Sequence, residues 1–384
     1  MPHLGIDIEQ FVVDPYASGI QRVLQYLARE WPSDRVSADF VVPFGDGYLL
    51  LSPHQAAELV GSAFASSGDT TVRQRVDGQV TRLVDECVQV SPGEALAMFS
   101  AWLLPEVSYL PSVLNRLDLF ARCMPVTMIG YDALPMTDPA NYRFSPGTAG
   151  QVSEYFRKLA TVDSVVCISD YAREAILDRL RRDRSLRTTV AHPGGDHVPV
   201  QLPGFRPDHG PVTFVRLGTL EARKMPVELV EAFRTARSRG AEARLVYVGH
   251  PSASDQAIND AVSDAVEEGI GVEWVAGASD DQVTEILRGS DAFISVGIEG
   301  YGIPVLEALR RGIPVLYGGI QPAAEIMVGR GAVHVGGSRP QDLSQMFVDF
   351  SREEKIAEAA ATVDAESVPT WGNFAEHVAT AAVD

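Results

Sequence analysis

Short β-rich runs alternate with segments of helical period through most of the 384 residues. This alternation predicts parallel sheets covered by helices, because parallel strands need long crossover connections. The clearest strand candidates are 126–129, 164–168, 212–217, 243–248, 292–296 and 313–317. Several of these runs end in Gly or Ser, and open α/β sheets bind ligands beyond the carboxyl ends of their strands. The predicted fold class is therefore α/β, with the ligand site at strand ends.

The length of the chain suits two domains of about 150 to 200 residues each. A boundary is indicated where the His-Pro-Gly-Gly-Asp run at 192–196 leads into a proline-rich stretch. We expect an N-terminal Rossmann-like domain over 1–196, a linker over 197–211 and a second Rossmann-like domain over 212–365. The remaining segment, 366–384, carries large apolar residues and is expected to form a helix that docks back on the N-terminal domain.

Composition and charge restrict the classes of partner. Apolar residues make up 46% of the chain and charged residues 22%, which is typical of globular domains. The net charge of −19 argues against nucleic acid and anionic membranes as partners, because phosphate surfaces would be repelled. The three cysteines are widely spaced and form no CxxC pair, and the sequence has no apolar run of 18 residues. We expect a cytoplasmic protein without strong membrane association.

The run 299–312 reads as a glycine loop followed by a helix, directly after the apolar run 292–296. Pro304 suits the first helical position and Gly312 the residue just past the helix end. Free N–H groups in the first turn, on Val305, Leu306 and Glu307, would then form an anion site that Gly300 and Gly302 let a ligand approach. The alternative is an ordinary strand-to-helix turn, in which Glu307 only complements the helix dipole.

The whole run resembles the E-x7-E signature of glycosyltransferase family 4, a family of retaining enzymes with the GT-B fold. The resemblance implies two Rossmann-like domains that face each other across a cleft. It also implies that Glu299 lies against the donor sugar and that Glu307 accepts hydrogen bonds from the ribose hydroxyls. The donor-binding residues that it implies in this run are Gly300, Tyr301, Gly302, Ile303, Val305, Leu306 and Glu307.

A second segment, 218–226, follows the strand candidate 212–217 and resembles the GxLExRKN-type loop of the same family. There Arg223 and Lys224 are expected to bind the diphosphate, whose charge grows as it leaves, and to take the place of a metal ion. No metal or other cofactor is expected. Many relatives carry Arg where this chain has Thr219, which places more of the phosphate contact on the Arg-Lys pair. The alternative is two solvated charges, but Lys224 is one of only three lysines in the chain.

Two segments of the N-terminal half resemble family loops as well. The run around Gly19 resembles the SGIxR loop, whose glycine backbone approaches the donor phosphate. The run 130–135 resembles the HDxxP segment, with Tyr131 where many members have His. Tyr131 could hold the sugar or acceptor without acting as a base near neutral pH. Asp132 could contact or deprotonate the acceptor hydroxyl, or it could only cap its loop.

Together these resemblances imply a retaining glycosyltransferase that moves a sugar from a nucleotide diphosphate sugar to a hydroxyl of a small soluble acceptor. The implied catalytic residues are Glu299, Asp132, Lys224 and Arg223. One alternative is a cell-envelope or lipid-linked glycan glycosyltransferase. Others are an epimerase or pseudoglycosyltransferase, and a noncatalytic nucleotide-sugar binder, which the departures at Tyr131 and Thr219 motivate. A homodimer stays open. The Arg-rich, Lys-poor, Ala-rich composition indicates a bacterial protein, for which the biosynthesis of a secondary metabolite or of a cell-envelope glycan would be natural.

Overall fold

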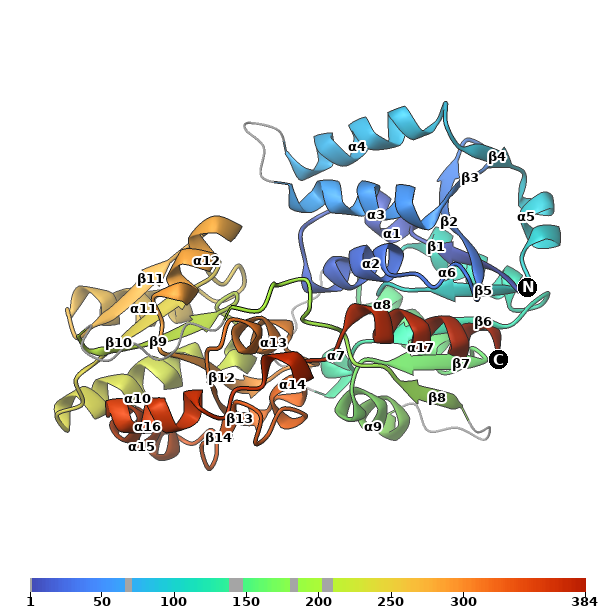
Figure 1. The fold of residues 1–384 in the computed structure, drawn as a ribbon. Helices are drawn as coiled ribbons and strands as arrows, with labels where there is room; N and C mark the ends of the chain where they lie inside the picture. The colour runs from blue at the N-terminus through green and yellow to red at the C-terminus, as the bar shows by residue number, and fades with distance from the viewer. Residues whose placement is uncertain (1, 66–70, 138–147, 180–185, 202–209) are drawn as a thin grey trace. The chain divides into compact units, whose positions relative to one another are not determined.

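The computed structural model describes residues 2–65, 71–137, 148–179, 186–201 and 210–384 (Figure 1). They form two compact units, each built on one sheet with helices on its faces, so the predicted α/β class is confirmed. The first unit contains the described residues of 2–193 together with Thr370–Asp384. The second unit contains the described residues of Gly194–Pro369, so the chain passes from one unit to the other after Pro193.

The sheet of the first unit has the order β4-β3-β2-β1-β5-β6-β7-β8. Its strands are β1 (His3–Asp7), β2 (Ser37–Phe44), β3 (Gly47–Leu51), β4 (Val88–Val90), β5 (Ala101–Leu104), β6 (Val126–Gly130), β7 (Ser164–Cys167) and β8 (Arg187–Val190). Neighbours pair in parallel except at β3, which runs antiparallel to β2 and β4. Strands β5 and β6 are buried along their whole length, as expected for strands covered on both faces.

The helices of the first unit begin largely at side-chain caps. At α2 the Ser18 Oγ accepts a hydrogen bond from Gln21 N, and α3, α4 and α5 each begin with a capping box. These helices are α1 (Glu9–Val13), α2 (Gly19–Arg29), α3 (Pro53–Gly61), α4 (Val72–Leu83), α5 (Pro92–Met98), α6 (Pro111–Phe120), α7 (Leu134–Thr137), α8 (Thr148–Leu159) and α9 (Asp170–Arg179).

The last helix of the chain, α17 (Trp371–Val383), is part of the first unit. Its Trp371 is 1% exposed and stacks on Tyr26 of α2 with 5.0 Å between ring centroids. Phe374 and Val378 are fully buried on the same helix. The segment 366–384 is therefore divided, because Thr370–Asp384 packs on the first unit while the preceding turn Ala365–Ser367 stays with the second.

The sheet of the second unit is parallel throughout its described strands, in the order β11-β10-β9-β12-β13-β14. Its strands are β9 (Val212–Leu217), β10 (Ala243–Val248), β11 (Val272–Val275), β12 (Ala292–Ile298), β13 (Val315–Ile320) and β14 (Ala332–His334). The chain adds strands outward from β9 on one side and from β12 on the other. The carboxyl ends of β9 and β12 are thus the switch point where such sheets bind ligands.

Helices of the second unit cover both faces of this sheet: α10 (Pro226–Ser238), α11 (Gln256–Glu267), α12 (Asp280–Arg288), α13 (Ile303–Arg310), α14 (Pro322–Glu325), α15 (Pro340–Phe350) and α16 (Glu353–Ala360). The core contains a fully buried aromatic cluster in which Phe347 of α15 packs edge-on against Phe214 and Phe233, at 5.2 and 4.9 Å between centroids. Burying each such ring stabilises the unit by about 1.5 to 3 kcal/mol. Among the described residues, no helix is both long and apolar enough to cross a bilayer.

Replacing Trp371 by Ala tests how strongly α17 is held to the first unit. Deleting a fully buried Trp costs about 3 to 5 kcal/mol of unfolding free energy, because the stack on Tyr26 is lost and a cavity remains. Denaturant unfolding should show this loss. Glu376→Ala in the same helix is the control, since its ion pair with Arg35 is exposed and is worth about 0 to 1 kcal/mol. Equal losses in both variants would contradict the packing role of Trp371.

Candidate functional site

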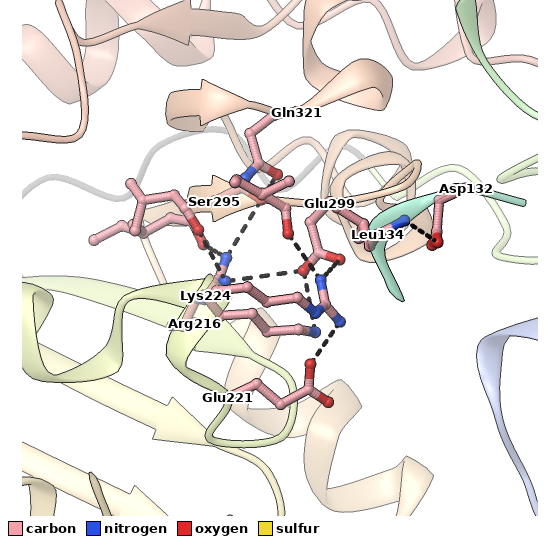
Figure 2. A network of polar contacts seen from close by, with 12 residues as sticks. Asp132, Leu134, Arg216, Glu221, Lys224, Ser295, Glu299 and Gln321 are labelled. Carbon is pink, nitrogen blue, oxygen red and sulfur yellow. Dashed lines mark hydrogen bonds and ion pairs between the residues drawn. The ribbon is translucent and has the colours of Figure 1, made fainter. Parts of the chain in front are cut away.

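The side chain of Glu299 binds two cations at the carboxyl end of β12 (Figure 2). Its Oε2 lies 2.8 Å from Nη1 of Arg223, and its Oε1 lies 3.0 Å from Nζ of Lys224. Both cations belong to the short 3-10 turn Ala222–Lys224 that follows β9. Two segments that the sequence singled out separately therefore meet at the switch point of the sheet.

Arg223 has further partners that hold it in place. Its Nη1 also donates to the carbonyl of Ile298 at 2.8 Å, and its Nη2 lies 2.7 Å from Oε2 of Glu221. The side chain of Arg223 is 16% exposed, as is that of Glu299. The alternative of two solvated charges is thus wrong for Arg223 and Lys224, which are mostly buried and bound to a carboxylate.

The cluster keeps Glu299 ionised. Burial by itself would raise the pKa of this carboxyl, but Lys224, Arg223 and Arg216 outweigh it and lower the pKa to about 2. Burial lowers the pKa of the Lys224 ammonium, and the charge of Glu299 opposes that effect. At neutral pH Glu299 is therefore a fixed negative charge and cannot serve as a general acid.

Three glycines at the ends of β9, β10 and β12 allow close contacts around the cluster. Gly297 has a φ of +93°, and a Cβ there would lie 2.1 Å from the carbonyl oxygen of Arg223. A Cβ on Gly218 would lie 2.8 Å from Nζ of Lys224, and one on Gly249 would lie 2.0 Å from the carbonyl oxygen of Gly218. A side chain at Gly297 or Gly218 would therefore clash with Arg223 or Lys224, the two cations that bind Glu299.

Met225 carries backbone strain beside the cluster. Its φ is +55°, and it is the one non-glycine residue with a positive φ in the described part of the chain. A left-handed conformation costs a residue of this shape about 1 to 2 kcal/mol. Met225 joins the Arg-Lys turn to α10, and its left-handed conformation sets the direction in which Arg223 and Lys224 extend toward β12.

The glycine loop at 299–302 leads into α13 as expected, with two differences. Gly302, with a φ of +109°, is the N-cap, so Pro304 is the second helical residue and not the first. The N–H of Val305 donates to the carbonyl of Gly302 at 3.0 Å, which corrects the prediction that this group is free. Gly312, with a φ of +74°, follows the helix end as predicted. The Val305 and Leu306 side chains are buried in the core.

Glu307 lies in α13 and binds a partner that the sequence did not indicate. Its Oε1 is 2.8 Å from Nε2 of His197, and the two side chains are 13% and 5% exposed. His197 directly follows the run 192–196 and falls in the predicted linker, where the sequence indicated no site residue. This contact orients the carboxylate that the resemblance assigns to the ribose.

The sequence also did not indicate Arg216 as a site residue. It lies in β9, is 1% exposed, and comes within 4.0 Å of Glu299 through its Nη2. Its guanidinium donates to the Ser295 Oγ at 3.3 Å, and that hydroxyl donates to Oε1 of Gln321 at 2.6 Å (Figure 2). The available signal was a charged residue within an otherwise apolar strand.

In the first unit, the sequence-predicted residues have local roles of their own. The Tyr131 hydroxyl is buried and donates to the carbonyl of Pro105 at 2.7 Å, and burial raises its pKa well above 10. Asp132 accepts a hydrogen bond from Leu134 N at 3.0 Å, which is the loop-capping alternative. Gly19 is the first residue of α2, and apart from its chain neighbours and the backbone of its own helix no described heavy atom comes within 4 Å of where its Cβ would stand.

A buried acidic group that the sequence did not indicate lies at the carboxyl ends of β1 and β5. Arg116 donates to Asp7 at 2.8 and 3.0 Å and lies 2.5 Å from Glu9. Glu106, 2% exposed, accepts a hydrogen bond from Phe11 N at 3.0 Å. Burial raises the pKa of Glu106 to about 8, so this acid is largely neutral at pH 7. Among the described residues, no group of three or more His, Cys, Asp or Glu could hold a metal ion.

Solved structures share this fold along the whole chain. The structure of Anabaena Alr3699/HepE in complex with UDP and glucose aligns with a TM-score of 0.64 over 99% of both chains, at 13% identity. The structure described as "Trehalose-6-phosphate from E. coli bound with UDP-2-fluoro glucose" aligns with a TM-score of 0.61 over 98% of both chains, at 12% identity. The fold is GT-B. At these identities the likeness concerns the fold alone.

Sequence comparison finds similarity to glycosyltransferases. Residues 202–362 match the family model described as Glycosyl transferases group 1, a span that contains the Glu299 cluster and Glu307. The serotype-specific mannosyltransferase WbdA of Escherichia coli is 23% identical in an alignment 377 residues long, which covers 90% of this chain. The chain spans 42% of the length of that relative.

Replacing Gly297 by Ala tests the close approach that brings Arg223 to Glu299. The added Cβ would meet the Arg223 carbonyl in a conformation that favours glycine, so we expect a loss of roughly 2 kcal/mol or more in unfolding free energy. Gly289→Ala is the control, because its Cβ would meet neighbours at an ordinary 3.6 Å. Thermal unfolding of both variants measures the difference, and a Gly297 variant as stable as the control would refute the steric argument.

Proposed function

We propose that this chain is a retaining, family 4-like glycosyltransferase that moves a sugar from a nucleotide diphosphate sugar to a hydroxyl group. The observation that carries the proposal is the contact of Glu299 with Arg223 and Lys224 at the switch point of the second sheet. It combines a buried negative charge with two directed cations. The family match over the same residues supports a nucleotide-sugar donor.

The cluster suits the two ends of a glycosyl diphosphate. Arg223 and Lys224 would bind the diphosphate and stabilise the charge that grows on it as the glycosidic bond breaks. Glu299 would accept hydrogen bonds from the sugar hydroxyls, and Glu307, oriented by His197, would accept them from the ribose. Tyr301 is 4% exposed, so it would offer backbone groups rather than its hydroxyl.

Transfer would break the bond between the anomeric carbon and the diphosphate oxygen and form one to the acceptor oxygen on the same face. The acceptor proton would pass to the departing diphosphate. Glu299 is bound by two cations and has a pKa of about 2, which makes it a weak nucleophile. A front-face route without a covalent intermediate is therefore proposed over double displacement. On the acceptor side, Asp132 is the candidate residue of the first unit.

The similar proteins indicate which donors and acceptors to test first. The relative WbdA is named a mannosyltransferase, and HepE was crystallised with UDP and glucose, so mannose and glucose donors are the first to try. The sequence favours a small soluble acceptor, whereas the serotype-specific relative favours the cell-envelope glycan alternative. A panel that contains both acceptor classes decides between them.

Because Arg223 and Lys224 would neutralise the diphosphate, we propose that transfer needs no metal ion. Transfer activity should therefore persist when EDTA is added to the assay.

Glu299→Ala and Lys224→Ala should each lower kcat by about 10²- to 10³-fold, since each removes a charge positioned for the transition state. Transfer from radiolabelled UDP- and GDP-sugars to the acceptor panel measures this loss. Lys355→Ala is the matched control, because Lys355 pairs with Glu358 on an exposed surface of α16. It should keep wild-type turnover.

Near wild-type turnover in both site variants would refute the proposed roles. A wild-type chain that binds nucleoside diphosphates, seen as a thermal shift, but transfers no sugar to any acceptor would instead favour the noncatalytic binder.

A further inference from the structure

Arg216 lies where strands β9 and β12 separate. The ladder between them joins Phe214 to Ala292 and Val215 to Phe293, while β12 continues to Ile298. Beyond the ladder, the Arg216 guanidinium donates to the carbonyls of Ile294 at 3.1 Å and Val296 at 3.3 Å. The side chain thus takes over the hydrogen bonds that a continued ladder would have supplied. It ties the end of β12, which pairs with β13 on its other side and leads directly to Glu299, back to β9.

Stability alone does not explain an arginine at this position. Val212 and Phe214, which share its face of β9, belong to the hydrophobic core. Arg216 is 1% exposed, and its Nε has no hydrogen-bond partner in the described chain. Burying a guanidinium costs more than its contacts commonly return, and apolar replacements of buried charges are often neutral or stabilising. A buried charge here is explained by what it does to its neighbours.

The neighbour with an opposite charge is Glu299, whose Oε1 lies 4.0 Å from Nη2 of Arg216. Arg223 and Lys224 bind the same carboxylate from the turn after β9, whereas Arg216 reaches it from within the strand (Figure 2). Its second anchor is the Ser295 hydroxyl, which is itself bound to Gln321 at the start of α14. Arg216 therefore connects β9, β12 and the β13–α14 loop beneath the carboxylate.

We propose that Arg216 is a positioning residue of the donor site, which closes the gap between β9 and β12 and supports Glu299 from the core side. Because Glu299 binds both Arg223 and Lys224, a fixed carboxylate keeps these two side chains oriented toward the proposed position of the diphosphate. Arg216 touches no substrate and acts through Glu299. The inference rests on the proposed function.

The test is a double-mutant cycle on Arg216 and Glu299, measured as single-turnover transfer from the donor that the wild-type chain uses. Arg216→Met keeps an unbranched side chain and removes the charge and the hydrogen bonds. We expect it to slow transfer about 30- to 100-fold in the wild-type background and less than about 3-fold in the Glu299→Gln background. The same factor in both backgrounds would mean a merely structural role and would overturn the proposal.

Phe233→Leu is the matched control, because Phe233 is fully buried in the same core on α10. Thermal unfolding establishes that all variants are folded at the assay temperature. We expect the Leu variant to lose thermal stability while it keeps at least about half of the transfer rate. Arg216→Met with wild-type turnover would overturn the proposal, as would an equal loss of turnover in the control.

Calorimetric binding of UDP and GDP separates this inference from the proposed function. If the wild-type chain transfers no sugar, the proposed function fails, and Arg216 is judged on binding alone. Binding at least about 5-fold weaker in Arg216→Met than in Phe233→Leu supports the positioning role, because misdirected cations hold a diphosphate less well. Equal binding in the two variants, or no binding to the wild-type chain, overturns it.

Discussion

The candidate site depends on one electrostatic arrangement, the carboxylate of Glu299 held among Arg216, Arg223 and Lys224. Each of these groups would be costly to bury alone, and together they neutralise much of one another's charge. With Glu221 also bound to Arg223, three cations face two carboxylates, so the cluster keeps a net positive charge that could bind a further anion. A net positive charge therefore remains even though Glu299, with a pKa of about 2, is ionised at neutral pH.

The sheet topology makes this arrangement accessible. Because the strand order switches between β9 and β12, their connections leave in opposite directions and the carboxyl ends of the two strands stay uncovered by a crossover. Gly218, Gly249 and Gly297 then let three loops approach one another closely. The strained backbone of Met225 sets the direction of the Arg-Lys turn. The apolar core around Phe214, Phe233 and Phe347 thus offsets the free-energy cost of the strained Met225 backbone and of the glycines, which contribute no side-chain packing at this edge.

The sequence predicted the strands and site residues of the second unit more closely than those of the first. There the strands β9 and β10 have the predicted bounds, and β13 begins two residues later than predicted, since Pro314 lacks the N–H that a ladder requires. In the first unit the motif residues Tyr131 and Asp132 bind backbone groups of their own unit. Their part in binding an acceptor stays a prediction, because a motif records residue types and not the partners that burial assigns to them.

The sequence by itself determined the α/β class and the two segments that meet in the site, because strand period, glycine placement and a long motif are local properties of the chain. Only the tertiary structure decided which charges share a carboxylate. Arg216 and His197 were invisible as site residues, since Arg216 is 83 positions from Glu299 and His197 is 110 positions from Glu307. Such contacts are made by the crossover connections of the sheet, which bring distant strand ends together, and no local pattern of residues encodes them.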